Sequence, residues 1–381
     1  MPYLKAVGGF LCFLVLASNV WSMSRWSESR GVYDDICYLR QAHLFQRFGL
    51  DGLNTDIKRD DDHYLVNKLK AINFPDWNVV GRAPCHTWIA KTNKYAIQYP
   101  PGTGFALALF PEGFQVIPLY VLASIVVAGF AFLAMSYAST LYSLAMVAVF
   151  GDVAIYLMIN PTKASYSMAP TMIVCALAGW LTAKLFVGGS RYRLVLLALV
   201  GLLIGLSVNF RLPNLLLSAG YGLYLAGAFL LARNRETFLQ GAAFGLAFLI
   251  GMAPTLAANV INAGSPLATT YGADPSDLRI GIDASILWAY FRDLQGSLLI
   301  LASAWVVWIL RAYGATGMRS VAIVTALNVV VNAVFFMTHP TFNPYYVMPV
   351  AMLSLWSLLF ASLMRSAESG DSRLVGQAAK P

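Results

Sequence analysis

Two adjacent carboxylates, Asp34 and Asp35, follow the first apolar segment of the chain after a short polar stretch. A carboxylate within hydrogen-bond reach of a hydroxyl group can take its proton while that oxygen attacks another molecule. The residues from 35 onward read as a helix, so both acids fall at a helix N-terminus, where the macrodipole favours negative charge. Aspartate is also a common N-cap. The pair therefore predicts either functional acids or a helix cap.

The segment 31–50 has the pattern of a helix that lies in a membrane interface. One side carries Tyr38, Ala42, Phe45 and Phe48, and the other carries Arg40, His43 and Arg47. A second apolar run, residues 98–110, begins with a Pro-Pro-Gly turn and is too short to cross a bilayer. Proline at a helix start costs no hydrogen bond. This run fits an interfacial or re-entrant helix, or an ordinary surface turn.

Several polar residues lie at the ends of apolar segments, namely Lys163, Arg211, His339 and Tyr345. A lysine there usually extends its ammonium group to the interface, and a tyrosine usually anchors a helix at the membrane surface. Arg211 is different, because an arginine in a tight turn between apolar helices is costly unless an acid or anion pairs with it. These residues are candidates for holding an anion, with the anchoring roles as the alternative.

One acid, Asp152, lies inside an apolar segment rather than at its end. An ionisable residue at membrane depth is a functional candidate, because burying it there is expensive. It could equally be a structural partner of a neighbouring tyrosine or asparagine.

The composition places these residues in a membrane protein. Of 381 residues, 58% are hydrophobic and 12% are charged, against roughly 25% charged residues in soluble domains. Long apolar runs recur along the whole chain, which excludes a cytosolic enzyme, a nucleic-acid-binding domain and a disordered scaffold. The net charge of +8 comes from Lys and Arg at the ends of apolar segments, where they orient a chain in a bilayer.

The predicted fold is an all-α polytopic membrane protein with about ten transmembrane helices. The spans are expected near 4–23, 115–137, 140–160, 165–186, 193–210, 212–232, 238–260, 296–313, 319–337 and 345–364. The first helix, 1–23, is expected to be retained, and the bundle to cover 115–364 with an outer loop at 263–295. The polar tail, 365–381, is predicted to be disordered.

Basic residues set the expected orientation. They gather in the short loops and the tail on the side of the N-terminus, so both termini are predicted to be cytoplasmic. The long segment 24–114 is then an extracytoplasmic loop with interfacial helices.

Four cysteines, Cys12, Cys37, Cys85 and Cys175, form no CxxC pair, so they predict no zinc or haem motif. Cys37 and Cys85 share the outer loop and could pair in an oxidising compartment. Sequence separation says nothing about the distance between their Cα atoms, so this pairing stays open. We expect neither a metal nor a cofactor.

Several short motifs resemble the GT-C superfamily of integral-membrane glycosyltransferases, whose familiar members are the protein O-mannosyltransferases and the lipid A aminoarabinose transferases. The motifs are D-D-x-x-Y-x-x-x-A at 34–42, YPPGTG at 99–104, NFRLPN at 209–214, NAGSPLATTYG at 262–272 and NPYYVMP at 343–349. The resemblance covers nearly the whole membrane portion, although each motif is short. Only the acidic pair together with the YPPG segment is moderately specific.

The resemblance implies a transferase that moves a sugar from a polyprenyl-phosphate carrier to a glycan, lipid or protein acceptor on the outer face, with inversion. It assigns the base to Asp34 and the second acid to Asp35. Donor phosphate binding is expected from Arg211, Lys163, His339 and Tyr345, and substrate-loop contacts from Tyr38, Tyr99 and Tyr271. The expected location is a bacterial inner membrane.

Familiar members are often longer and carry a soluble C-terminal domain, so we expect acceptor recognition here from residues 24–114 or from a partner. The main alternative function is a polytopic transporter or lipid flippase, and another is a non-catalytic assembly subunit or degenerate transferase. Transporters usually show related halves and ionisable residues near the midplane. The sequence has one buried acid and no evident repeat, which favours the enzyme.

Overall fold

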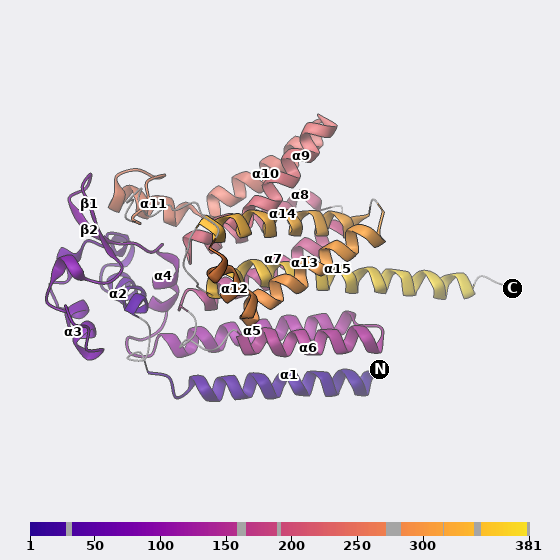
Figure 1. Ribbon diagram of the computed structural model, residues 1–381, viewed down its shortest axis with the longest axis horizontal. Helices are drawn as coiled ribbons and strands as arrows, with labels where there is room; N and C mark the ends of the chain where they lie inside the picture. The colour runs from indigo at the N-terminus through magenta and orange to yellow at the C-terminus, as the bar shows by residue number, and fades with distance from the viewer. Residues whose placement is uncertain are drawn as a thin grey trace.

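A computed structural model describes residues 1–27, 33–157, 165–188, 192–271, 283–314, 316–338 and 344–378. It shows a bundle of long helices with a smaller unit of short elements at one end (Figure 1). We call this unit, residues 33–114, the head unit. The first residues of the chain and its last described residues lie at the opposite end of the bundle from the head unit.

Each of the ten predicted apolar segments is helical in the bundle. Its elements are α1 (Pro2–Met23), α5 (Val116–Tyr137), α6 (Leu141–Leu157), α7 (Met168–Phe186), α8 (Arg193–Val208), η5 (Leu212–Ser218), α9 (Ala219–Ala232), α10 (Arg235–Gly251), α11 (Ala253–Ala263), α13 (Leu294–Ala312), α14 (Gly317–Thr338) and α15 (Pro344–Ala378). The short helix α12 (Ala284–Arg292) lies within the predicted outer loop.

Seven helices of the described chain are long and apolar enough to cross a membrane. The pair α10 and α11 makes an eighth if it is counted as one span, although it bends by 50°. Pro254 lies in the first turn of α11, where its missing N–H is tolerated, so the break falls just before it. Two further apolar helices, α6 and α8, have 17 and 16 residues. The prediction of an all-helical membrane protein is confirmed at this level.

The core of the bundle surrounds α15. The apolar window of α15 is 94% buried, and α7 packs along it. Gly179 of α7 lies directly against Trp356 of α15, where a Cβ would come 2.5 Å from the tryptophan Cβ. Gly205 of α8 similarly touches the backbone at Phe248 of α10. Small residues let helix backbones approach closely, which is how helices associate where the hydrophobic effect does not drive them together.

The helix α15 extends to Ala378. This corrects the sequence prediction of a disordered tail from residue 365, within the described part of that segment. The first residues after the apolar stretch, such as Arg365, Ala367 and Glu368, are good helix formers that continue an existing helix without a new nucleation cost.

The head unit is built around one central helix. Its elements are α2 (Tyr33–Phe48), η2 (Gly49–Leu53), η3 (Ile57–Arg59), α3 (Tyr64–Ala71), η4 (Val80–Arg82), β1 (His86–Ile89), β2 (Lys94–Ile97) and α4 (Gly102–Ala108). The two strands form an antiparallel hairpin in which His86 pairs with Ile97. Cys37 and Cys85 form a disulfide with their Cα atoms 6.5 Å apart, which ties α2 to the start of this hairpin.

The helix α2 is buried in the head unit on more than one side, which differs from the interfacial helix that we predicted. Arg40, expected on the polar side, is fully buried. Its guanidinium donates to the carbonyl oxygens of Thr55 and Asp56 and to Nε2 of His86. These partners lie far enough along the chain that helical periodicity could not reveal them.

Candidate functional site

The candidate site lies where α2 meets the bundle, and the acidic pair begins it. Asp35 is 1% exposed, and its Oδ1 accepts a hydrogen bond from the backbone N–H of Tyr166 at 3.1 Å. This contact joins α2 to the segment directly before α7. The backbone of Asp34 lies in the first turn of α2, but its side chain is outside the described residues.

Two of the sequence motifs meet beside α2. The N–H of Gly102 donates to the carbonyl oxygen of Asn209 at 2.7 Å, and the hydroxyl of Thr103 donates to the carbonyl oxygen of Phe210 at 3.1 Å. The motif at 99–104 is therefore held against the motif at 209–214. Neither contact was visible in the sequence, because more than a hundred residues separate the partners.

Glycine is required at this junction for close approach. A Cβ on Gly104 would come 2.6 Å from the side chain of Gln41, and one on Gly102 would come 2.7 Å from atoms of Asn209. Distances under 3.0 Å would force the neighbour to move. The short helix α4 can lie between α2 and the end of α8 because these positions carry no side chain.

Arg211 is the cation of the site. It is 7% exposed, and its Nη1 donates to the carbonyl oxygen of Tyr345 at 2.8 Å. The guanidinium carbon lies 5.0 Å from the ring centre of Tyr345 and 5.2 Å from that of Tyr346. Within the described part of the chain, Arg211 forms no ion pair with a carboxylate. Its charge is held by a carbonyl and two aromatic faces, an arrangement that leaves it able to bind an anion.

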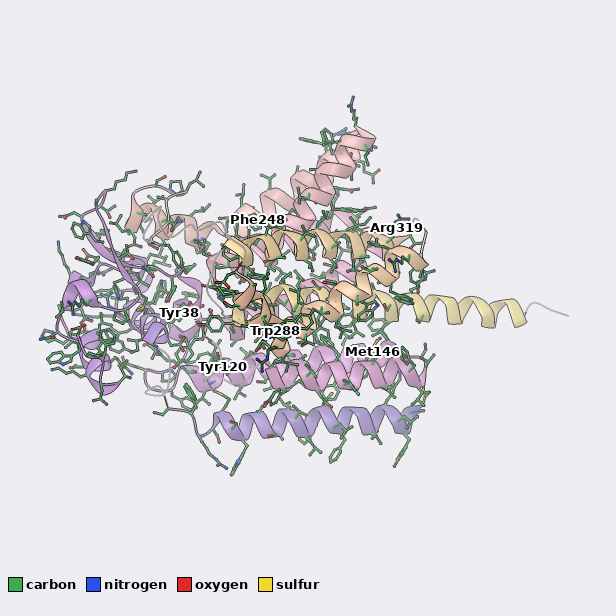
Figure 2. The ribbon with its side chains drawn as sticks, viewed as in Figure 1. Tyr38, Tyr120, Met146, Phe248, Trp288 and Arg319 are labelled. Carbon is green, nitrogen blue, oxygen red and sulfur yellow. A yellow bond between two sulfur atoms is a disulfide. The ribbon has the colours of Figure 1, made fainter. Side chains whose placement is uncertain are left out.

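Three predicted tyrosines form a continuous aromatic row. The rings of Tyr38 and Tyr99 stack with centroids 4.8 Å apart, and Tyr99 meets Tyr271 edge-on at 6.1 Å. They come from α2, the turn before α4 and the loop after α11. Figure 2 shows Tyr38 at the junction of the head unit with the bundle, near Tyr120 of α5.

The hydroxyl of Tyr38 lies within electrostatic reach of both the acid and the cation. Burial raises the pKa of Tyr38 to about 12, although the positive charge of Arg211 and hydrogen bonds with Ser167 and Ser165 oppose the rise. The Asp35 carboxylate adds a smaller upward effect on the pKa. Tyr38 therefore stays a neutral phenol at neutral pH. Asp35, Tyr38 and Arg211 form one buried cluster that offers a carboxylate, a hydroxyl and a fixed positive charge.

Among the remaining predicted site residues, the structure describes only Asp152. Lys163 and His339 lie outside the described residues. Asp152 is on α6, where it faces the thiol of Cys12 in α1. That position gives Asp152 a partner in the packing of α1 against α6, whereas the structural alternative expected from the sequence was a neighbouring tyrosine or asparagine.

Sequence reasoning missed the serines of the site. Ser165 and Ser167 are both buried beside Tyr38, and the hydroxyl of Tyr120 donates to the carbonyl oxygen of Ser165 at 3.1 Å. The one available signal was a short polar stretch, Ser-Tyr-Ser, directly before an apolar helix.

A buried network behind the site fixes α2 in the head unit. Desolvation, together with the charge of Arg40, lowers the pKa of His86 to about 3. Burial also lowers the pKa of Arg40 to about 10. His86 is therefore neutral, with Nδ1–H donating to the carbonyl oxygen of Pro84 at 2.7 Å and Nε2 accepting from Arg40 at 2.6 Å.

The grouping of Cys37, Cys85 and His86 brings three ligand-type side chains close together. The two sulfur atoms are joined in the disulfide, and both ring nitrogens of His86 are engaged in hydrogen bonds. In the oxidised protein these three side chains therefore stabilise the head unit rather than offer ligands to a metal.

The sequence and the structure match no known protein-family model, no curated protein and no solved structure.

Proposed function

We propose that this chain is an integral-membrane glycosyltransferase of the GT-C type. It would move a sugar from a polyprenyl-phosphate donor to a glycan, lipid or protein acceptor of the cell envelope. The reaction would take place on the extracytoplasmic face of a bacterial inner membrane, with ten spans and both termini in the cytoplasm.

The observation that carries the proposal is the convergence of Asp35, Tyr38 and Arg211 at the junction of the head unit with the bundle. Asp35 and Tyr38 come from the motif at 34–42 and Arg211 from the motif at 209–214, yet the charges of Asp35 and Arg211 both act on the Tyr38 hydroxyl. The reaction needs a base for the acceptor hydroxyl and a cation for the departing lipid phosphate. The cluster supplies the cation, Arg211, and a carboxylate, Asp35, next in sequence to the proposed base Asp34.

The proposed roles follow the family resemblance of the sequence motifs. Asp34 takes the acceptor proton as the acceptor oxygen attacks the anomeric carbon and the bond to the lipid phosphate breaks. Asp35, held by the Tyr166 N–H, supports it as the second acid. Arg211 and Tyr345, with Lys163 and His339, bind the phosphate as its charge develops.

The aromatic row contributes to substrate binding in this proposal. Tyr38, Tyr99 and Tyr271 present ring faces and edges, and flat apolar faces of this kind pack well against sugar rings. No metal or cofactor is part of the proposed reaction.

The test is a reconstituted transfer assay with the full chain in liposomes. Polyprenyl-phosphate-linked mannose, aminoarabinose and galacturonic acid are offered in turn with a membrane extract as acceptor source. Release of free polyprenyl phosphate, the product common to every donor, is followed by mass spectrometry. The proposal predicts release with at least one donor, accompanied by loss of the matching sugar from envelope glycans or lipids in cells that lack the protein. Unchanged glycans and lipids in those cells, together with no release from any donor, would contradict it.

A lipid flippase is the second candidate, and a cavity in the bundle favours it. The cavity has a volume of about 920 Å³ and is lined mainly by apolar residues of α6, α13 and α15, including Met146, Trp305 and Leu359. It could hold a lipid chain in the half of the bundle away from the head unit. A fluorescent lipid that crosses the liposome membrane without sugar transfer would support this candidate over the enzyme.

A further inference from the structure

A second cavity, separate from the acidic cluster, lies between the head unit and the start of the bundle. It has a volume of about 360 Å³, within the range of small-molecule sites. Its lining comes from the end of α1, from α2 and α3, and from the start of α5, and includes Trp26, Leu39, Lys68, Phe114 and Gln115.

Two polar side chains of the lining, Gln115 and Trp26, lack hydrogen-bond partners among the described residues. Gln115 is 0% exposed, and neither its amide nitrogen nor its carbonyl oxygen has a hydrogen-bond partner among the described residues. The indole N–H of Trp26 is likewise buried without one. A polar group buried without hydrogen bonds destabilises the fold, so two such groups among the lining residues of one cavity point to a ligand that satisfies them.

The charge of the lining selects the kind of ligand. Lys68 carries the one formal charge among the lining residues, and no carboxylate lines the cavity in the described part of the chain. The ammonium of Lys68, the Trp26 N–H and the Gln115 amide N–H₂ are donors, and the Gln115 carbonyl is an acceptor. A ligand with phosphate oxygens and at least one hydroxyl group matches this set.

The position of the cavity selects a lipid. Met23 ends α1 and Val116 begins α5, and these two long apolar helices pack against each other. The cavity therefore lies at the level where lipid headgroups meet the ends of spanning helices. Phe114 is 52% exposed beside it, as expected for an aromatic residue at a membrane interface.

We infer that this cavity binds the phosphate-bearing, hydroxylated headgroup of an anionic phospholipid, with Gln115, Trp26 and Lys68 as its ligands. The site uses none of the residues proposed for sugar transfer, so it stands or falls independently of that function.

The test uses the delipidated full chain in detergent and native mass spectrometry. Phosphatidylglycerol, which offers a phosphate and hydroxyl groups, is compared with phosphatidylcholine, which has no hydroxyl group on its headgroup. The variants are Gln115→Leu and Lys68→Gln. Lys70→Gln, on the same helix but exposed, is the matched control. Inorganic phosphate is added as a competitor to separate a lipid site from a simple anion site.

We expect wild type to bind phosphatidylglycerol more tightly than phosphatidylcholine. Gln115→Leu and Lys68→Gln should each weaken phosphatidylglycerol binding about fivefold or more, the effect of losing one net hydrogen bond. Lys70→Gln should bind as wild type does. Without lipid, Gln115→Leu should unfold at the same temperature as wild type or higher, because leucine leaves no unpaired amide.

Three results would overturn the inference. The first is equal phosphatidylglycerol binding by wild type, Gln115→Leu and Lys68→Gln, and the second is an equal loss in Lys70→Gln. The third is displacement of the lipid by millimolar inorganic phosphate, which would show that the site recognises a free anion. If Gln115→Leu fails to fold, the comparison of Lys68→Gln with Lys70→Gln still tests whether the cavity binds the lipid headgroup.

Discussion

The substitution Arg211→Gln tests the assignment of the cationic group in the proposed transferase. Arg211 is 7% exposed and forms no ion pair among the described residues, so an arriving phosphate would be its first anionic partner. A hydrogen bond to a charged group contributes about 1.5–3 kcal/mol. Loss of this interaction should therefore raise the KM for the polyprenyl-phosphate sugar about 10- to 100-fold, because 1.4 kcal/mol corresponds to a factor of ten.

The assay is a donor titration at saturating acceptor, followed by an acceptor titration at saturating donor, in liposomes. The KM for the acceptor should change less than threefold. Arg319→Gln is the matched control, because Arg319 lies at the opposite end of the bundle from the candidate site (Figure 2). Equal changes in the two KM values, or an Arg319→Gln effect as large as that of Arg211→Gln, would refute phosphate binding by Arg211.

Three further predictions concern the stability of the head unit and the bundle, which hold the site between them. The pKa of His86 falls from 6.5 in the unfolded chain to about 3 in the folded protein. Between these two pH values the unfolded state binds a proton that the folded state does not. The free energy of unfolding therefore falls as the pH drops below 6.5. Denaturant unfolding should show that the free energy of unfolding has dropped by at most about 2 kcal/mol at pH 5. If the His86→Gln variant showed the same dependence of this free energy on pH, the prediction would be wrong. Replacing Cys37 and Cys85 together by serine should lower the free energy of unfolding by about 2–4 kcal/mol, measured by thermal unfolding, and an equal stability would show that the disulfide is dispensable. Gly205→Val should lower the unfolding temperature clearly, because any Cβ there meets the backbone of α10. Gly222→Val, at a position with open space around it, should change the unfolding temperature little. Equal shifts in the two variants would count against close packing of α8 against α10.

The helices were predictable from the sequence because each one depends on local properties. A run of about 20 apolar residues predicts a spanning helix without knowledge of its neighbours. The break between α10 and α11 was missed because Pro254 was counted inside one continuous apolar segment, although it lies in the first turn of a new helix.

The site was predictable in its residue types but not in its contacts. The acids and the arginine were unusual in an apolar chain, and the tyrosines stand in the motifs that carry the resemblance, so both groups could be selected. The hydrogen bond from the Tyr166 N–H to Asp35 joins residues 131 positions apart, and no periodicity reports such a contact. Arg40 was placed on the polar side of its helix because its partners, Thr55 and His86, were unknown.

The disulfide illustrates the same limit. The sequence allowed Cys37 and Cys85 to pair but could not say whether their Cα atoms came within bonding range. The fold brings them to 6.5 Å by placing the β1–β2 hairpin against α2. The buried amide of Gln115 is a further example, because a glutamine at the start of an apolar segment gives no sign that it will be fully enclosed.

The role of the acidic pair in the chemistry is tested by the rate of polyprenyl phosphate release by Asp34→Asn and Asp35→Asn in liposomes. Asparagine keeps an oxygen that can accept the Tyr166 N–H at position 35, so both variants should fold and reach the membrane in normal amounts. Asp51→Asn, at an exposed carboxylate of the same head unit, is the control.

We expect Asp34→Asn to lower the rate at least 100-fold, because a general base typically contributes a factor of about 10²–10⁴ to the rate. Asp51→Asn should leave the rate unchanged. Full activity in Asp34→Asn and Asp35→Asn, with normal folding, would contradict the claim that the acidic pair at the start of α2 performs the chemistry.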